Sequence, residues 1–157
     1  MFVTFYEHLV RVSFGPQDGI TKEALWSEMR ESVLRPSEFV EHMLGEEIVS
    51  QKTTPTGFEC DRHLKFEQFT VDDHVDVLDE QYTVVSQVKA SQHFPESSFL
   101  MRIEEPESGH LFVRFIYEEE ARNENPLYEN LRKQAYQVKD QQLVEQLLAQ
   151  LIKKQHN

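Results

Sequence analysis

The chain has 157 residues, 16 of them basic and 28 acidic, so its formal net charge is −12. A field of this sign repels phosphate backbones and anionic lipid, so we expect neither nucleic acid nor a membrane surface as a partner. The single cysteine, Cys60, excludes an intrachain disulfide, and no apolar run approaches the ~20 residues of a membrane-spanning helix. We therefore expect one cytoplasmic domain that covers residues 1–157.

The N-terminal part is predicted to form one strand followed by two short helices. Residues 2–14 alternate in polarity with the period of a strand. The residues on the more apolar face of this strand are Tyr6, His8, Val10, Val12 and Phe14. The first helix begins after Thr21 and ends before Pro36, because proline disfavours the helical conformation of the residue before it. A second, shorter helix is expected from its cap at Ser37 to Gly45.

Residues 46–120 alternate as a series of strands joined by short turns, which predicts an antiparallel meander. The last two strands form a hairpin that turns at residues 106–109. Its second strand is the most regular in the chain, with apolar residues at every other position. These residues are Leu111, Val113, Phe115 and Tyr117. Their shared face is too apolar to remain in water, so another element must cover it.

Residues 126–155 are predicted to form one uninterrupted helix that covers this apolar face. Asn125 can cap it, and Pro126 suits its first position. At 1.5 Å per residue the helix is roughly 45 Å long, enough to cross a sheet. These elements predict an α+β fold in which a curved antiparallel sheet of about seven strands wraps around the C-terminal helix. A cavity between the two is the expected functional site.

This order of elements resembles the helix-grip fold of the START and birch-pollen-allergen superfamily (SRPBCC). Five local motifs resemble those of one of its branches, the AtaL-like family. They are EHLV at 7–10, ITKEALW at 20–26, RPSEF at 35–39, IEEPESGHLFVRFIY at 103–117 and KQAY at 133–136. The resemblance implies a hydrophobic cavity and ligand binding as the commonest role. It assigns no catalytic residues, and the cyclases, aromatases and hydroxylase components among superfamily members leave catalysis open.

The predicted cavity is lined from both sides. The candidates from the sheet are Tyr6, His8, Val10, Phe66, Phe99, Met101, Val113, Phe115 and Tyr117. The candidates from the helix are Leu131, Gln134, Ala135 and Val138. Among these, His8, Tyr117 and Gln134 are expected to orient a ligand, although a buried histidine is more often a structural residue with a hydrogen-bonding partner.

Two charged residues interrupt the inward apolar alternation of their strands. Arg62 and Asp73 form either a buried ion pair that faces the cavity or, with equal weight, two solvated groups at a bulge or strand end. His63 and His74 could approach each other among aspartates, but on an acidic surface we expect ordinary charged side chains there and no metal. Cys60 is expected to be a small buried hydrophobic residue.

Three hypotheses follow for function. The first is a binding protein for a small hydrophobic or aromatic molecule, without a cofactor. The second is a cyclase or isomerase that acts on a polyketide-like or other hydrophobic metabolite in the same cavity, with His8 or a tyrosine as acid–base. The third is a protein–protein module or homodimer. Because no phosphate loop, nucleophile elbow or dinucleotide fingerprint is present, the sequence favours the first.

Overall fold

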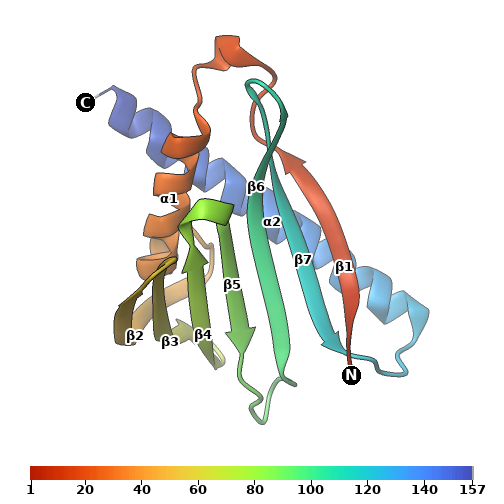
Figure 1. The fold of residues 1–157 in the computed structure, drawn as a ribbon. Coiled ribbons are helices and arrows are strands. Elements are labelled where there is room, and N and C mark those ends of the chain that lie inside the picture. The colour runs from red at the N-terminus through yellow and green to blue at the C-terminus, as the bar shows by residue number, and fades with distance from the viewer. Residues whose placement is uncertain (157) are drawn as a thin grey trace.

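The computed structural model describes residues 1–156 and contains a seven-stranded sheet with two α-helices. The helices are α1 (Lys22–Leu34) and α2 (Pro126–Gln155). The strands are β1 (Phe2–Arg11), β2 (Met43–Thr54), β3 (Gly57–Phe66), β4 (Thr70–Leu78), β5 (Thr83–Val88), β6 (Ser97–Glu107) and β7 (His110–Glu120). They pair antiparallel in the order β1-β7-β6-β5-β4-β3-β2 (Figure 1). The predicted α+β helix-grip architecture is confirmed.

Both helices lie on the same side of the sheet, and α2 runs obliquely across it (Figure 1). The sheet curves, so that β2 to β4 bend toward the side that carries the helices. α1 packs against α2. Within residues 1–156, neither helix is both long and apolar enough to cross a lipid bilayer.

The hydrophobic core lies between the sheet, α1 and the C-terminal half of α2. Its most buried helical residues include Leu25, Met29, Val144, Leu147 and Leu151. The predicted apolar face of β7 is confirmed, since Leu111, Val113, Phe115 and Tyr117 are all buried. The N-terminal half of α2 is different, because several of its apolar side chains stay half exposed or more. These are Leu127 at 62%, Tyr128 at 61%, Leu131 at 51% and Val138 at 55%.

The local start signals of the helices are confirmed. The Thr21 hydroxyl accepts a hydrogen bond from the Ala24 amide at 3.1 Å, which caps α1. The Asn125 side chain accepts from the Leu127 amide at 2.9 Å, which caps α2. The hairpin between β6 and β7 turns at Ser108 and Gly109, within the predicted range 106–109, and β6 continues to Glu107. Gly109 has a φ of 79°, and a side chain there would overlap the backbone of Pro16.

Two predicted boundaries are wrong. The second helix is only a single 3-10 turn at Pro36–Glu38, and Gly45 lies inside β2. The amide and hydroxyl of Ser37 both donate to the Glu46 carboxylate, so this serine ties the turn to β2 instead of capping a helix. The first strand ends at Arg11 and not at Phe14. Two residues after the end of β1, the Ser13 hydroxyl donates a hydrogen bond to the Gly109 carbonyl at 2.6 Å, and the chain leaves the sheet.

Candidate functional site

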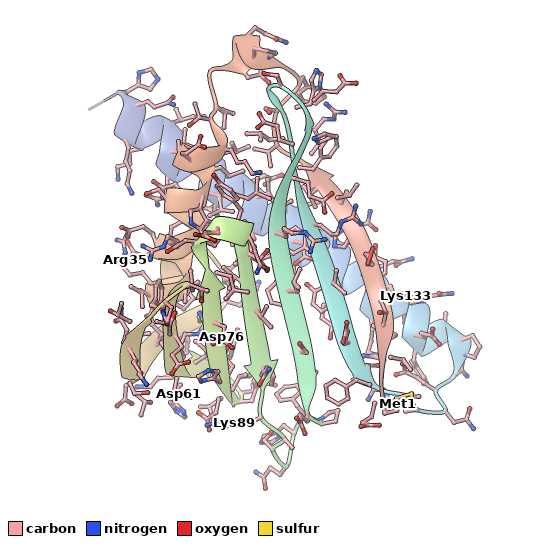
Figure 2. The ribbon with its side chains drawn as sticks, viewed as in Figure 1. Met1, Arg35, Asp61, Asp76, Lys89 and Lys133 are labelled. Atoms are coloured by element: carbon pink, nitrogen blue, oxygen red, sulfur yellow. The ribbon has the colours of Figure 1, made fainter. Side chains whose placement is uncertain are left out.

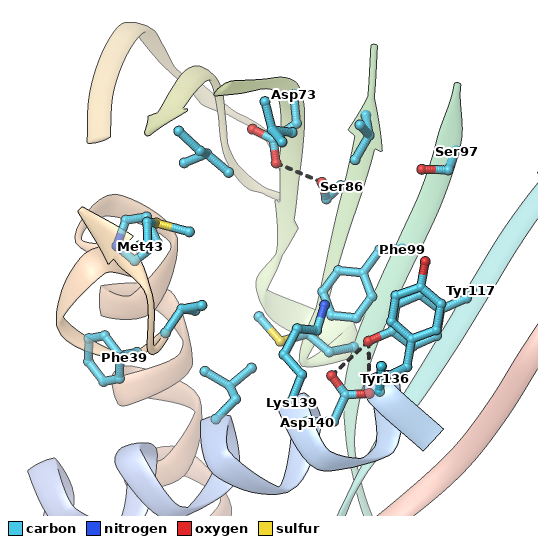
Figure 3. A pocket seen from close by; sticks show the side chains of 18 of the residues that line it. Phe39, Met43, Asp73, Ser86, Ser97, Phe99, Tyr117, Tyr136, Lys139 and Asp140 are labelled. Atoms are coloured by element: carbon cyan, nitrogen blue, oxygen red, sulfur yellow. Dashed lines mark hydrogen bonds between the residues drawn. The ribbon is translucent and has the colours of Figure 1, made fainter. Parts of the chain in front are cut away.

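A cavity of about 850 Å³ lies between the concave face of the sheet and the N-terminal half of α2 (Figure 3). The sheet residues of its wall include the predicted candidates Phe66, Phe99, Met101 and Tyr117. The helix contributes the predicted Leu131, Gln134, Ala135 and Val138. The third side comes from the segment after α1, with Phe39, Val40 and Met43. That side was not predicted, because the sequence placed these residues on a helix of unknown packing.

Five predicted candidates lie outside the cavity wall: Tyr6, His8, Val10, Val113 and Phe115. Val113 and Phe115 are fully buried in the core beneath the helix. His8 is packed between two of the other rings, with centroid distances of 4.8 Å to Tyr6 and 5.4 Å to Phe115. The alternation of β1 and β7 identified the inward face, but it does not distinguish the packed part of that face from the open part.

His8 belongs to a polar network centred on Asp140 of α2. Its Nε2 lies 2.7 Å from Asp140 Oδ2, and Asp140 is fully buried. The Tyr117 hydroxyl donates to the same carboxylate at 2.7 and 2.8 Å (Figure 3). Burial and the nearby negative charge of Asp140 raise the pKa of the Tyr117 phenol. Tyr117 therefore stays protonated and acts as a hydrogen-bond donor that fixes α2 to β7.

The charged pair on β3 and β4 is buried, which decides between the two predicted alternatives. The Arg62 guanidinium donates to both Asp73 oxygens, at 2.9 and 2.6 Å, and to the Val33 carbonyl at 2.8 Å. Ser86 donates to Asp73 at 2.7 Å. Arg62 and Asp73 are 11% and 2% exposed and both border the cavity. The pair is well supplied with partners, so it forms a polar but neutral region of an otherwise largely apolar wall.

Lys139 is a cavity residue that the sequence reasoning missed. Its Nζ lies 5.2 Å from the ring centroids of Phe99 and Tyr117 and 5.3 Å from that of Tyr136 (Figure 3). Desolvation by the surrounding protein lowers the pKa of its ammonium group, although the side chain is exposed in the open cavity and the charge of Asp140 acts in the opposite direction. The spacing of residues along the predicted helix could have identified Lys139. Lys139 follows Leu131 and Ala135 at intervals of four, which puts a lysine on the apolar face of the helix.

The histidines of β3 and β4 lie away from the cavity. His63 contacts Asp72 at 2.6 Å, and His74 contacts Asp61 at 3.0 Å. Figure 2 shows Asp61 and Asp76 among the polar side chains on the outer face of this part of the sheet. Glu59, His74 and Asp76 are close enough to share an ion, but all are partly exposed acidic-surface groups. Cys60 is buried as predicted, and burial raises the pKa of its thiol to about 11, so it is inert.

A comparison with protein families shows which family the chain belongs to. The family model for AtaL, described as acetylaranotin biosynthesis cluster protein L, matches residues 12–155. The chain belongs to the AtaL family. The resemblance found in the sequence motifs is thus confirmed, and the AtaL match extends from the end of β1 to the last turn of α2.

Two solved structures share the fold of this AtaL-family chain. The crystal structure of Ara h 8.0201 has 14% identity and a TM-score of 0.62, over 98% of this chain and 99% of that one. The ZhuI aromatase/cyclase from Streptomyces sp. R1128 has 10% identity and a TM-score of 0.63, over 98% and 96%. At these identities the likeness establishes the helix-grip fold alone. No curated protein sequence matches the chain significantly.

Proposed function

We propose that this AtaL-family protein binds a small hydrophobic or aromatic molecule in the cavity between the sheet and the N-terminal half of α2. The supporting observation is the combination of an open cavity of about 850 Å³ with apolar helix residues, Leu131 and Val138, left half exposed beside it. Ligand pockets commonly have volumes of roughly 300–1,000 Å³. Each Å² of apolar surface that a ligand removes from water contributes about 25 cal/mol to binding.

The shape of the wall favours a flat, ring-containing ligand. The rings of Phe99, Tyr117 and Tyr136 form a continuous aromatic surface, with centroids 5.0 Å apart for Phe99 and Tyr117 and 4.0 Å for Tyr117 and Tyr136. Such a surface favours offset stacking of a further ring. The buried pair of Arg62 and Asp73 borders the same cavity and can orient a polar substituent.

Fluorescence titration with N-phenyl-1-naphthylamine, a neutral aromatic dye, tests the proposal. We expect saturable binding by the wild-type protein and at least a tenfold higher Kd for Ala135→Trp, because the indole would fill the cavity from α2. Ala149→Trp is the matched control, since Ala149 is an exposed alanine of the same helix that does not line the cavity. Equal dye affinity in wild type and Ala135→Trp would contradict the proposal, as would no binding by the wild type.

A cyclase or isomerase that acts on a hydrophobic metabolite remains the second candidate. In its favour, the cavity wall carries a tyrosine bonded to a buried carboxylate, Tyr117 with Asp140, in a fold that also carries an aromatase/cyclase. Against His8 as the acid–base group, this side chain lies outside the wall and is engaged by Asp140. The protein–protein or homodimer hypothesis stays a prediction.

A further inference from the structure

Lys139 differs from Lys133 and Lys154 of the same helix in having no anionic partner. Lys133 lies 3.2 Å from Glu129, and Lys154 lies 2.7 Å from Glu28. Lys139 forms no ion pair and no hydrogen bond with any side chain within residues 1–156. Its neighbour Asp140 is already engaged by His8 and Tyr117. The ammonium group therefore lies beside aromatic rings in the open cavity, where the side chain is exposed and where water, and no side chain of residues 1–156, accepts its protons.

This environment disfavours the charged form of the amine. Removing an ammonium group from water costs free energy unless an anion or acceptors replace the hydration, and rings replace it only in part. Desolvation by the surrounding protein lowers the pKa of Lys139 even though the open cavity leaves the side chain exposed, and a ligand that fills the cavity would remove the remaining water. A lysine with the ordinary pKa of about 10.4 is neutral in roughly one molecule in 2,500 at pH 7, and each unit of lowering increases that fraction tenfold. A desolvated lysine in an apolar pocket is a recognised way to obtain an amine nucleophile.

We propose that Lys139 is a nucleophile that forms an imine with the aldehyde or ketone group of an aromatic or apolar ligand held in the cavity. This inference rests on the proposed binding function and narrows its ligand class to carbonyl compounds. The site offers the two requirements of such a reaction together. The aromatic surface of Phe99, Tyr117 and Tyr136 can hold the ring of the ligand, and the same three rings surround the amine.

The chemistry uses only the ligand and the amine. The lone pair of Nζ attacks the carbonyl carbon, and one N–H proton passes to the carbonyl oxygen to give a carbinolamine. Loss of that hydroxyl group with the remaining N–H proton releases one water molecule and leaves the C=N bond. No electrons are gained or lost. Protonation of the imine nitrogen gives an iminium cation, which the faces of the surrounding rings stabilise.

Reductive trapping of the full chain tests this assignment. Wild-type protein is incubated at pH 7 with 2-naphthaldehyde and sodium cyanoborohydride, and peptide mass spectrometry measures the rate of N-alkylation at each lysine. We expect Lys139 to be labelled at least tenfold faster than Lys133, which lies on the same helix over the ring of Phe5 but has a carboxylate partner. In Lys133→Gln the labelling of Lys139 should be unchanged. Lys139→Arg should remove the fast site.

Labelling of Lys139 at the rate of Lys133, or fast labelling that persists elsewhere in Lys139→Arg, would overturn the inference. The comparison within the wild-type protein does not depend on the folding of any variant. Binding of N-phenyl-1-naphthylamine, which has no carbonyl group, separates the two claims. If the dye binds and Lys139 is not preferentially labelled, the imine proposal fails while the binding proposal stands; if the dye does not bind, the binding proposal fails.

Discussion

At the scale of single residues, the buried pair of Arg62 and Asp73 has hydrogen-bonding partners for its charged groups. Arg62 and Asp73 replace apolar residues in two inward-facing strand positions, yet together with Ser86 and the Val33 carbonyl they form a closed set of hydrogen bonds. The Val33 carbonyl lies in the last turn of α1, where a cation is also favoured by the helix dipole. The pair therefore links α1 to β3 and β4 at the edge of the cavity.

We predict that breaking this pair costs much more stability than breaking an exposed one. Arg62→Met leaves Asp73 buried without its counterion, and we expect the free energy of unfolding to fall by about 3–5 kcal/mol. The control is Arg35→Met, which removes exposed pairs with Glu31 and Glu38 and should cost no more than roughly 1 kcal/mol. Urea denaturation of both variants measures the difference.

The double variant Arg62→Met, Asp73→Leu distinguishes an orphaned charge from lost packing. With both charges removed, we expect the protein to be more stable than Arg62→Met alone. If the double variant is less stable than the wild type by the sum of the separate effects of Arg62→Met and Asp73→Leu, the two residues contribute independently and the ion-pair argument is wrong.

At the scale of elements, a helix or strand was predicted well where the residues that determine it lie close together in the sequence. The start of α1 after Thr21 and the alternation of β7 depend on residues a few positions apart, and both were predicted correctly. The segment after α1 was misread because Ser37 bonds to Glu46 of β2, a tertiary contact that propensity does not contain. Which inward residues line the cavity also depends on where α2 crosses the sheet. For this reason the sequence prediction placed His8 in the cavity wall, where it does not lie, and did not include Lys139, which does.

The two halves of α2 should differ in local stability. The C-terminal half is anchored by Leu143, Val144, Leu147 and Leu151, all buried, whereas the N-terminal half carries the exposed Leu127 and Leu131 beside an open cavity. Few buried apolar contacts allow local opening. Hydrogen exchange followed by mass spectrometry should show faster exchange in residues 127–138 than in residues 143–151. A saturating cavity ligand should slow the first region selectively.

The dye N-phenyl-1-naphthylamine provides the ligand for that measurement, and Ala135→Trp provides its control, because the dye should then give no protection. Equal exchange rates in the two halves of the free protein would contradict the packing argument. Protection spread evenly over the sheet and both helices would show instead that the dye stabilises the whole fold without acting on this part of α2.

At the scale of the whole molecule, acidity opposes folding while specific ion pairs support it. A net charge of −12 makes the compact state self-repulsive at pH 7. Several carboxylates nevertheless have pKa values lowered by bound donors: Arg114 lowers that of Glu104, Arg132 that of Glu124, and Ser50 with His74 that of Asp61. The reciprocal bond from Asp61 raises the pKa of His74 above 6.5. These effects act in different ranges of pH.

We predict that the protein is most stable at about pH 5–6 and not at pH 7. His74 has a raised folded pKa, so its contribution is complete below pH 6.5 and is lost as the pH rises through the folded value. Lower pH also reduces the net negative charge toward the pI of about 5.0. The paired carboxylates act oppositely, because their contribution is present above the ordinary values of 3.8 to 4.5 and is lost as the pH falls further.

Urea denaturation between pH 3 and pH 8 tests the balance of these terms. Stability should rise from pH 8 to about pH 6, then fall steeply below about pH 4. In His74→Gln the increase in stability from pH 8 to pH 6 should be smaller, while the loss of stability below about pH 4 should be unchanged. Salt at 0.5 M screens exposed charges over a few Å, so it should reduce the pH dependence of stability that comes from the net charge. The loss of stability below about pH 4 should remain largely unchanged. A stability that increases steadily from pH 5 to pH 8 would show that neither self-repulsion nor the pairing of His74 determines the profile.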